Sequence, residues 1–183
     1  CIRTEYKPFH EDYSNIRTYT RDGIERIEYG KYDEACGVIE YWLNDEMFRV
    51  EYHPLHPLHG EVEHWEEGKH VRTEYTPFHP CHGQIACYDA CGIHVARIEF
   101  AQDHIEHGRI DHLASNGRVV SREFKDPHYN CGRTYNWDEK GNCEMVFALS
   151  LSHELRGQGF LFTFDGQCVK RYYGLDDEIC NVV

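Results

Sequence analysis

The sequence predicts an all-β fold: an elongated, single-layer antiparallel sheet of about eight sequential β-hairpin repeats, which could roll into a half-pipe. Three observations predict it. An Arg-x-Glu-aromatic motif recurs about every 23 residues, a series of glycines runs in phase with it, and the composition, with 13 Tyr, 9 Phe and 3 Trp, suits strands. No segment with the 3.6-residue period of an amphipathic helix stands out.

The Arg-x-Glu-aromatic motif marks the second strand of each predicted hairpin. Successive aromatic residues from Tyr6 to Phe147 are spaced 23, 23, 23, 25, 24 and 23 residues apart. The clear copies are Arg3–Tyr6, Arg26–Tyr29, Arg49–Tyr52, Arg72–Tyr75 and Arg97–Phe100, and degraded copies follow at Glu123-Phe124, Phe147 and Tyr172-Tyr173.

A glycine opens the first strand of each hairpin, and a second glycine or a turn cluster closes it eight or nine residues later. The opening glycines are Gly37, Gly60, Gly83, Gly108, Gly132 and Gly157. Five residues after each lies Trp42, Trp65, Tyr88, Leu113, Trp137 or Phe162. The turn glycines are Gly68, Gly92, Gly117, Gly141 and Gly166. This order predicts strand, turn, strand and connector in every repeat.

The unit Gly60–His82 illustrates the expected register. We expect Trp65 opposite His70, and therefore Glu63 opposite Arg72 and, one repeat earlier, Glu40 opposite Arg49. This register collects one apolar face: Ile39, Phe48, Val50, Tyr52, Val62, Val71, Tyr75, Ile85, Ile98 and Phe100. A face of this kind has to curl, dimerise or dock on a partner.

We expect residues 1–183 to form a single array. It begins mid-repeat at Cys1, and degenerate capping repeats run from about 133 to 183, where Phe160, Phe162 and Phe164 gather. The open edge at the first hairpins could pair with another chain.

Composition excludes some classes of partner and indicates a compartment. A net charge of −13, without a concentrated basic stripe, argues against nucleic acid. The sequence contains no run of 18 apolar residues, so no transmembrane segment is predicted. Nine cysteines at irregular spacings favour reduced thiols, hence an intracellular reducing compartment, the cytoplasm or an organelle.

The hairpin period, the turn glycine, the aromatic residue of the second strand and the endings His59-Gly60, His82-Gly83 and His107-Gly108 resemble the MORN repeat family and its variants. Here Arg-x-Glu-Tyr stands where the family usually has Tyr-x-Gly-x-Trp. The resemblance implies a single-layered sheet used for scaffolding, dimerisation or docking. Tyr88–Gly92 and Trp137–Gly141 also resemble the YD-type repeat of large bacterial toxins.

The connectors carry the one metal-like pattern. His56 and His59, His79 and His82, and His104 and His107 form three His-x-x-His pairs in one phase of the repeat, flanked by Asp33-x-x-Cys36 and His128-x-x-Cys131. Such pairs can chelate zinc, but each supplies half of a tetrahedral site. The alternative is that each His caps a corner by bonding a backbone group and stacking on the next repeat.

No catalytic constellation or cofactor-binding fingerprint emerges, and Cys81, Cys87 and Cys91 lack a redox motif. The row Trp42, Trp65, Tyr88 and Trp137 is either a partner-binding surface or a ladder of stacked rings. We therefore expect a non-catalytic scaffold or protein-interaction module, without a cofactor, that binds protein partners or itself through the apolar face or the edge. The alternatives are a His-rich zinc module and an accessory domain of a larger enzyme.

Overall fold

The computed structural model describes the chain except for residues 7–13, 129, 148–157, 174–177 and 181–183. The described residues form sixteen β-strands and no helix. The strands are β1 (Ile2–Glu5), β2 (Asn15–Tyr19), β3 (Ile24–Tyr29), β4 (Val38–Leu43), β5 (Glu46–Tyr52), β6 (Glu61–Glu66), β7 (Lys69–Tyr75), β8 (Gln84–Tyr88), β9 (Val95–Phe100), β10 (Arg109–Leu113), β11 (Val119–Phe124), β12 (Arg133–Trp137), β13 (Cys143–Phe147), β14 (Gln158–Phe162), β15 (Cys168–Tyr173) and β16 (Glu178–Cys180).

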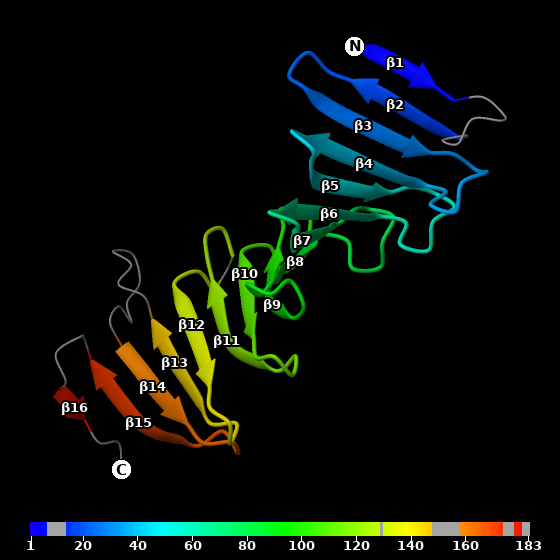
Figure 1. The fold of residues 1–183 in the computed structure, drawn as a ribbon. Coiled ribbons are helices and arrows are strands. Elements are labelled where there is room, and N and C mark those ends of the chain that lie inside the picture. The colour runs from blue at the N-terminus through cyan, green and yellow to red at the C-terminus, as the bar shows by residue number, and fades with distance from the viewer. Residues whose placement is uncertain (7–13, 129, 148–157, 174–177, 181–183) are drawn as a thin grey trace. The chain divides into compact units, whose positions relative to one another are not determined.

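The chain divides into two compact units, Cys1–His94 with β1 to β8 and Val95–Val183 with β9 to β16. Within each unit the strands are antiparallel and lie side by side in chain order (Figure 1). Each strand contacts only its neighbours in the sequence, so neither unit has a second layer and neither closes into a barrel. The predicted fold, a single-layer antiparallel sheet of sequential hairpins, is confirmed.

Glycines shape the connectors between hairpins. Gly60 has a φ of +93° and donates its N–H to the Tyr52 carbonyl at 3.2 Å, while its own carbonyl accepts from Thr76 N–H at 2.8 Å. A Cβ at Gly60 would lie 3.0 Å from the backbone nitrogen of His79 in the next connector. The opening glycine is therefore the place where successive connectors stack, which side chains would prevent. Gly157 of this series lies outside the described residues.

A β-bulge in the hairpins changes the predicted register. Trp65 does lie opposite His70, but the pairing shifts between His64 and Trp65, so Glu63 faces Thr73 rather than Arg72. The hairpin of β4 and β5 has the same shift, and Glu40 faces Val50 rather than Arg49. One extra residue in a strand moves every side chain beyond it to the other face relative to its partner.

The expected apolar face is therefore wrong, because its members divide between two faces. In the first unit Val50, Tyr52 and Tyr75 share a face with Trp42 and Trp65, which we call the Trp face. Ile39, Val62 and Ile85 lie on the opposite face, and Phe48 and Val71 are the extra residues of the bulges. In the second unit the pairing places Ile98 on the face of Trp137, which is the Trp face there, and Phe100 follows by strand alternation.

Both faces bury apolar side chains. Ile39 and Val62, 4% and 9% exposed, are buried beside the Arg-Glu pairs, whereas Ile27 and Val50, 6% and 5% exposed, are buried on the Trp face. The Arg-Glu motif forms ion pairs along a single strand, as in Arg49–Glu51 at 2.8 Å and Arg72–Glu74 at 2.9 Å. The long charged side chains thus cover the aliphatic residues next to them, and no continuous apolar face is left open among the described strands.

Candidate functional site

The first histidine of each predicted metal pair caps its connector. Nδ1 of His56, His79 and His104 accepts the backbone N–H two residues later, at 3.2, 3.1 and 3.0 Å. The three rings also contact the aromatic ring at the end of the preceding strand, with centroids 4.5, 4.6 and 4.7 Å apart. His128 repeats both contacts in the second unit. Because Nδ1 accepts a backbone N–H, the neutral ring carries its own proton on Nε2, and in this arrangement neither nitrogen offers a free lone pair to a metal.

The second histidine of each pair lies at the end of the connector, next to the opening glycine. His59 places Nδ1 3.3 Å from the Tyr52 carbonyl and stacks on Phe78 of the next connector, with centroids 5.2 Å apart. His82 and His107 occupy the same position in the following connectors. Among the described residues, no three His, Cys, Asp or Glu side chains come together as metal ligands. His56, His79 and His104 thus bond the backbone of their own connectors, and His59 stacks on the next connector.

On the Trp face of the first unit, a glutamate joins two aromatic side chains. Glu40 accepts from the Tyr29 hydroxyl and from the Trp42 indole N–H, both at 3.0 Å. In the next repeat Glu63 accepts from the Trp65 indole N–H at 3.1 Å. Burial, and then the nearby Glu40 carboxylate, raises the pKa of Tyr29 to about 12. Both glutamates are thus engaged in hydrogen bonds to aromatic side chains within the sheet.

Tyr88 ends a stack of rings that crosses from one repeat to the next. The His70 ring lies between Trp65 and Tyr88, with centroid distances of 5.1 and 4.1 Å. Below it, Thr73 is 1% exposed, and its Oγ1 is 2.9 Å from His70 Nε2 and 3.4 Å from the Tyr88 hydroxyl. In the first unit Trp65 and Tyr88 thus belong to one stack through His70, whereas Trp42 is bonded to Glu40.

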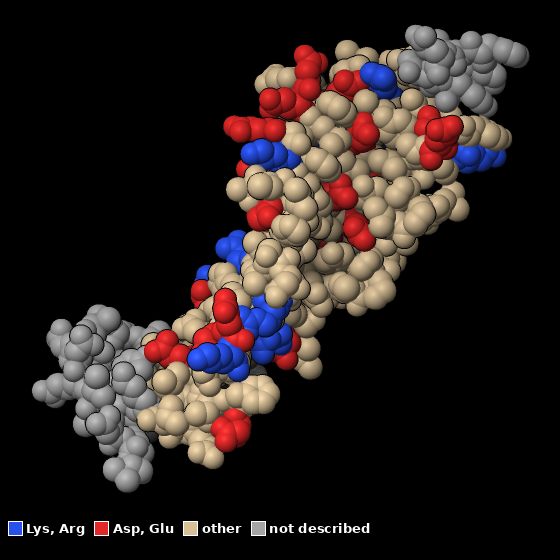
Figure 2. All heavy atoms as spheres, turned by 60° about the horizontal axis from the view of Figure 1, so that its bottom comes forward, with Lys and Arg blue, Asp and Glu red and all other residues tan. Residues whose placement is uncertain are grey.

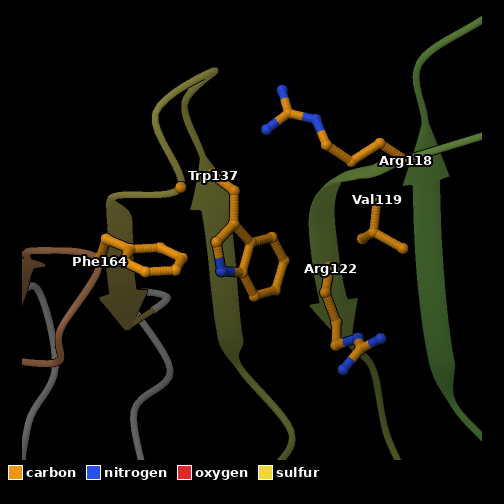
Figure 3. A pocket seen from close by; sticks show the side chains of 6 residues that line it. Arg118, Val119, Arg122, Trp137 and Phe164 are labelled. Atoms are coloured by element: carbon orange, nitrogen blue, oxygen red, sulfur yellow. The ribbon is translucent and has the colours of Figure 1, made fainter. Parts of the chain in front are cut away.

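Trp137, the fourth member of the row, lies in a different setting. Its ring lines a pocket of about 470 Å³ in the second unit, together with Arg118, Val119, Arg122, Gly141 and Phe164 (Figure 3). It stacks on Tyr135 with centroids 6.1 Å apart, and no contact within the described part of the chain gives its indole N–H an acceptor. The row of four residues thus contains one member that borders open space.

A buried carboxylate binds two arginines, one of which lines the pocket. Asp111, 3% exposed, accepts from Arg109 Nη2 at 2.6 Å and from Arg122 Nε at 2.6 Å. Burial by itself would raise the pKa of Asp111, but the hydrogen bonds from Arg109 and Arg122 outweigh it and hold this pKa below its usual value. Arg122 is fixed by this contact with its guanidinium 5.8 Å from the Trp137 ring centroid.

Sequence reasoning did not single out Asp111, Arg118 or Arg122. A signal was present for two of them: Asp111 stands at the repeat position of Glu40 and Glu63, and Arg122 at the position of Val50 and Thr73. Asp111 and Arg122 face each other across neighbouring strands, as Glu40 and Val50 do in an earlier repeat. Both positions differ together, which indicates that an ion pair replaces the earlier contacts in this repeat.

The cysteines whose side chains the structure describes, Cys81, Cys87 and Cys91 among them, form no disulfide bond. Burial raises the pKa of the Cys143 thiol. Within the described residues there is no helix long and apolar enough to cross a membrane.

Comparison with known proteins adds no relative. No protein-family model matches the chain, and no similar curated protein was found. The resemblance to MORN repeats therefore stays a prediction from the residues.

Proposed function

We propose that this chain is a non-catalytic scaffold that binds a protein partner through its connectors. The observation that carries this proposal is a row of three apolar side chains at the third position of successive connectors. Tyr32, Leu55 and Phe78 are 66%, 82% and 75% exposed. We call these three residues the connector row. Large apolar side chains that repeat at one position of a rigid array favour a protein contact over random exposure.

The connectors are held in place before any partner binds. In the connector of Leu55, His56 N–H donates to the His53 carbonyl and His59 N–H to the His56 carbonyl, both at 3.1 Å. Proline precedes both Leu55 and Phe78 and restricts the backbone further. A surface that is already ordered loses little conformational entropy on binding, which favours its use in recognition.

The sheet faces of the first unit support the same proposal, because their described strands carry no comparable row of exposed apolar side chains. The carboxylates of Glu40 and Glu51 are bonded to Tyr, Trp or Arg side chains within the sheet. A general acid or base requires a group that can reach a substrate, so these glutamates suit a structural role. Acidic and basic side chains lie interspersed on the face seen in Figure 2.

Self-association tests the proposal, because a second copy of the chain is the partner available in a purified sample. The wild-type protein should sediment faster as its concentration rises. The double variant Leu55→Ser and Phe78→Ser should remain monomeric at every concentration. A control, Leu43→Ser with Ile93→Ser, removes two exposed apolar side chains outside the connector row, which are 40% and 69% exposed, and should behave like wild type.

A wild-type protein that stays monomeric at all concentrations would contradict the proposal. Equal behaviour of the connector variant and the control would contradict it as well, since general surface hydrophobicity would then explain the association.

A further inference from the structure

The surroundings of Trp137 differ from those of the tryptophans in the first unit. In the first unit, Trp42 and Trp65 each donate to a glutamate two residues earlier. At the equivalent position before Trp137 stands Tyr135, whose ring packs edge-on against Phe124 with centroids 5.8 Å apart. The indole of Trp137 is thus left to line an open hollow rather than to bond a carboxylate.

The wall of this pocket is aromatic on two sides. Phe164, in the turn after β14, is 82% exposed, and its ring packs against the turn after β12 (Figure 3). Gly141 makes this approach possible: a Cβ there would lie 2.8 Å from Phe164 Cδ2. Val119 completes the apolar lining. The ring of a ligand could contact Trp137 and Phe164 together, an arrangement that favours aromatic groups.

The rim of the pocket carries positive charge that the protein does not fully neutralise. Arg118 donates Nη1 to the backbone carbonyl of Asp138 at 2.7 Å, and a carbonyl does not cancel its charge. Arg122 shares the carboxylate of Asp111 with Arg109, which also pairs with Glu106 at 3.5 Å.

The Asp138 side chain bonds within its own turn rather than to Arg118. Oδ1 of Asp138 accepts from Lys140 N–H at 2.9 Å and from Asn142 N–H at 2.8 Å, and Oδ2 accepts from the Asn142 side chain at 2.7 Å. Among the described residues no carboxylate lies within ion-pair distance of the Arg118 guanidinium, which lines the pocket in a protein whose net charge is −13. An anion is the ligand that complements this rim.

We propose that this pocket binds an aromatic ring that carries a carboxylate, with the ring against Trp137 and Phe164 and the carboxylate on Arg118. A volume of about 470 Å³ holds one group of this size. Two sources supply this chemistry: the C-terminal aromatic residue of a peptide, and a free small aromatic acid. The inference does not depend on the connector row, which belongs to the other unit.

Calorimetric titration of the full chain tests the inference with matched probes. N-acetylphenylalanine supplies ring and carboxylate, and its amide supplies the ring alone. The acid should bind about tenfold more tightly than the amide, because a charge-assisted hydrogen bond to Arg118 is lost with the carboxylate. A tetrapeptide of three alanines and a C-terminal phenylalanine distinguishes the sources. Tighter binding than the acid indicates a peptide terminus, and equal binding indicates a free aromatic acid.

Variants locate the binding. Arg118→Gln should weaken the acid about tenfold and leave the amide unchanged, whereas Arg21→Gln, the same charge change on an exposed turn of the first unit, should alter neither. Phe164→Ala should weaken both probes, whereas Ile105→Ala, which removes a large apolar side chain that is 94% exposed and lies outside the pocket and the connector row, should weaken neither. Circular dichroism of each variant checks its folding.

Three results would overturn the inference: no binding of any probe, equal binding of acid and amide, or equal effects of Arg118→Gln and Arg21→Gln. None of them bears on self-association through the connector row, so the two proposals can fail separately.

Discussion

Replacement of Asp111 by Asn should destabilise the protein more than replacement of any exposed acid. The Asp111 side chain is 5% exposed and holds the guanidinium groups of Arg109 and Arg122, whose side chains are 20% and 28% exposed. Breaking a fully buried pair costs about 3–5 kcal/mol, and the partial exposure of the arginines reduces this, so we expect a loss of about 2 kcal/mol in the free energy of unfolding.

Urea denaturation at neutral pH measures this loss. Glu123→Gln is the matched control: Glu123 lies on the same strand as Arg122 and is 2.9 Å from His112 Nε2, but its side chain is 37% exposed. It should change the free energy of unfolding by about 0.5 kcal/mol or less. Similar losses for Asp111→Asn and Glu123→Gln would refute the reasoning.

The pH dependence gives the same prediction a second readout. Because the folded pKa of Asp111 is lowered, its ion pairs stabilise the protein above the unfolded pKa of about 3.9, and this stabilisation is lost as pH falls through the folded pKa. The difference between wild type and Asp111→Asn should therefore shrink below about pH 4. A difference that stays constant down to the lowest accessible pH would contradict the assignment.

Two further predictions concern the tyrosines and the histidines. The pKa values of Tyr29 and Tyr75 are raised to about 12, mainly by burial, so their contribution to stability is complete below about pH 10 and is lost as pH rises towards 12. Thermal unfolding across this range should show that loss, and a Tyr29→Phe and Tyr75→Phe variant should lack most of it; equal slopes would disprove the cause. Elemental analysis after mild dialysis should find less than stoichiometric zinc, because the backbone occupies Nδ1 of His56, His79 and His104. Stoichiometric zinc that disappears in His79→Ala would reverse this conclusion.

The fold could be predicted because its main signals are local. Turn and connector glycines require left-handed backbone at fixed intervals, as at Gly60 and Gly83 with φ of +93° and +77°. These requirements appear directly in the sequence as a period, and strand alternation between them follows.

The faces could not be predicted from alternation, because a bulge leaves little mark in the sequence. The position of Val71 between His70 and Arg72 looks like any strand residue, yet the pairing skips it. A single skipped residue reverses the assignment of Val62 relative to Thr73. Ion pairing was misassigned for the same reason, since Arg72 bonds Glu74 along its own strand.

The candidate pocket was predicted in part. Trp137 was recognised as a possible contact residue, but Arg118 and Phe164 reach it from turns that lie 46 residues apart in the sequence. The successive pairing of β11, β12, β13 and β14 brings these turns to one end of their strands. Side chains on turns follow no strand period, so their convergence becomes visible only in the structure.

The central claim is that the 23-residue hairpin is the structural unit, and deletion of one unit tests it most directly. Removing residues 60–82 joins His59 to Gly83. In the intact chain Arg49 lies opposite His64, and Arg72 lies opposite Cys87 at the same position of the next repeat. After the deletion Arg49 can therefore pair with Cys87 in the same register. Urea unfolding of this variant, followed by far-UV circular dichroism, should remain cooperative with native-like strand content. Deletion of residues 69–82, which removes β7 and its connector alone, should abolish the cooperative transition. Equal tolerance of both deletions would contradict the repeat assigned here.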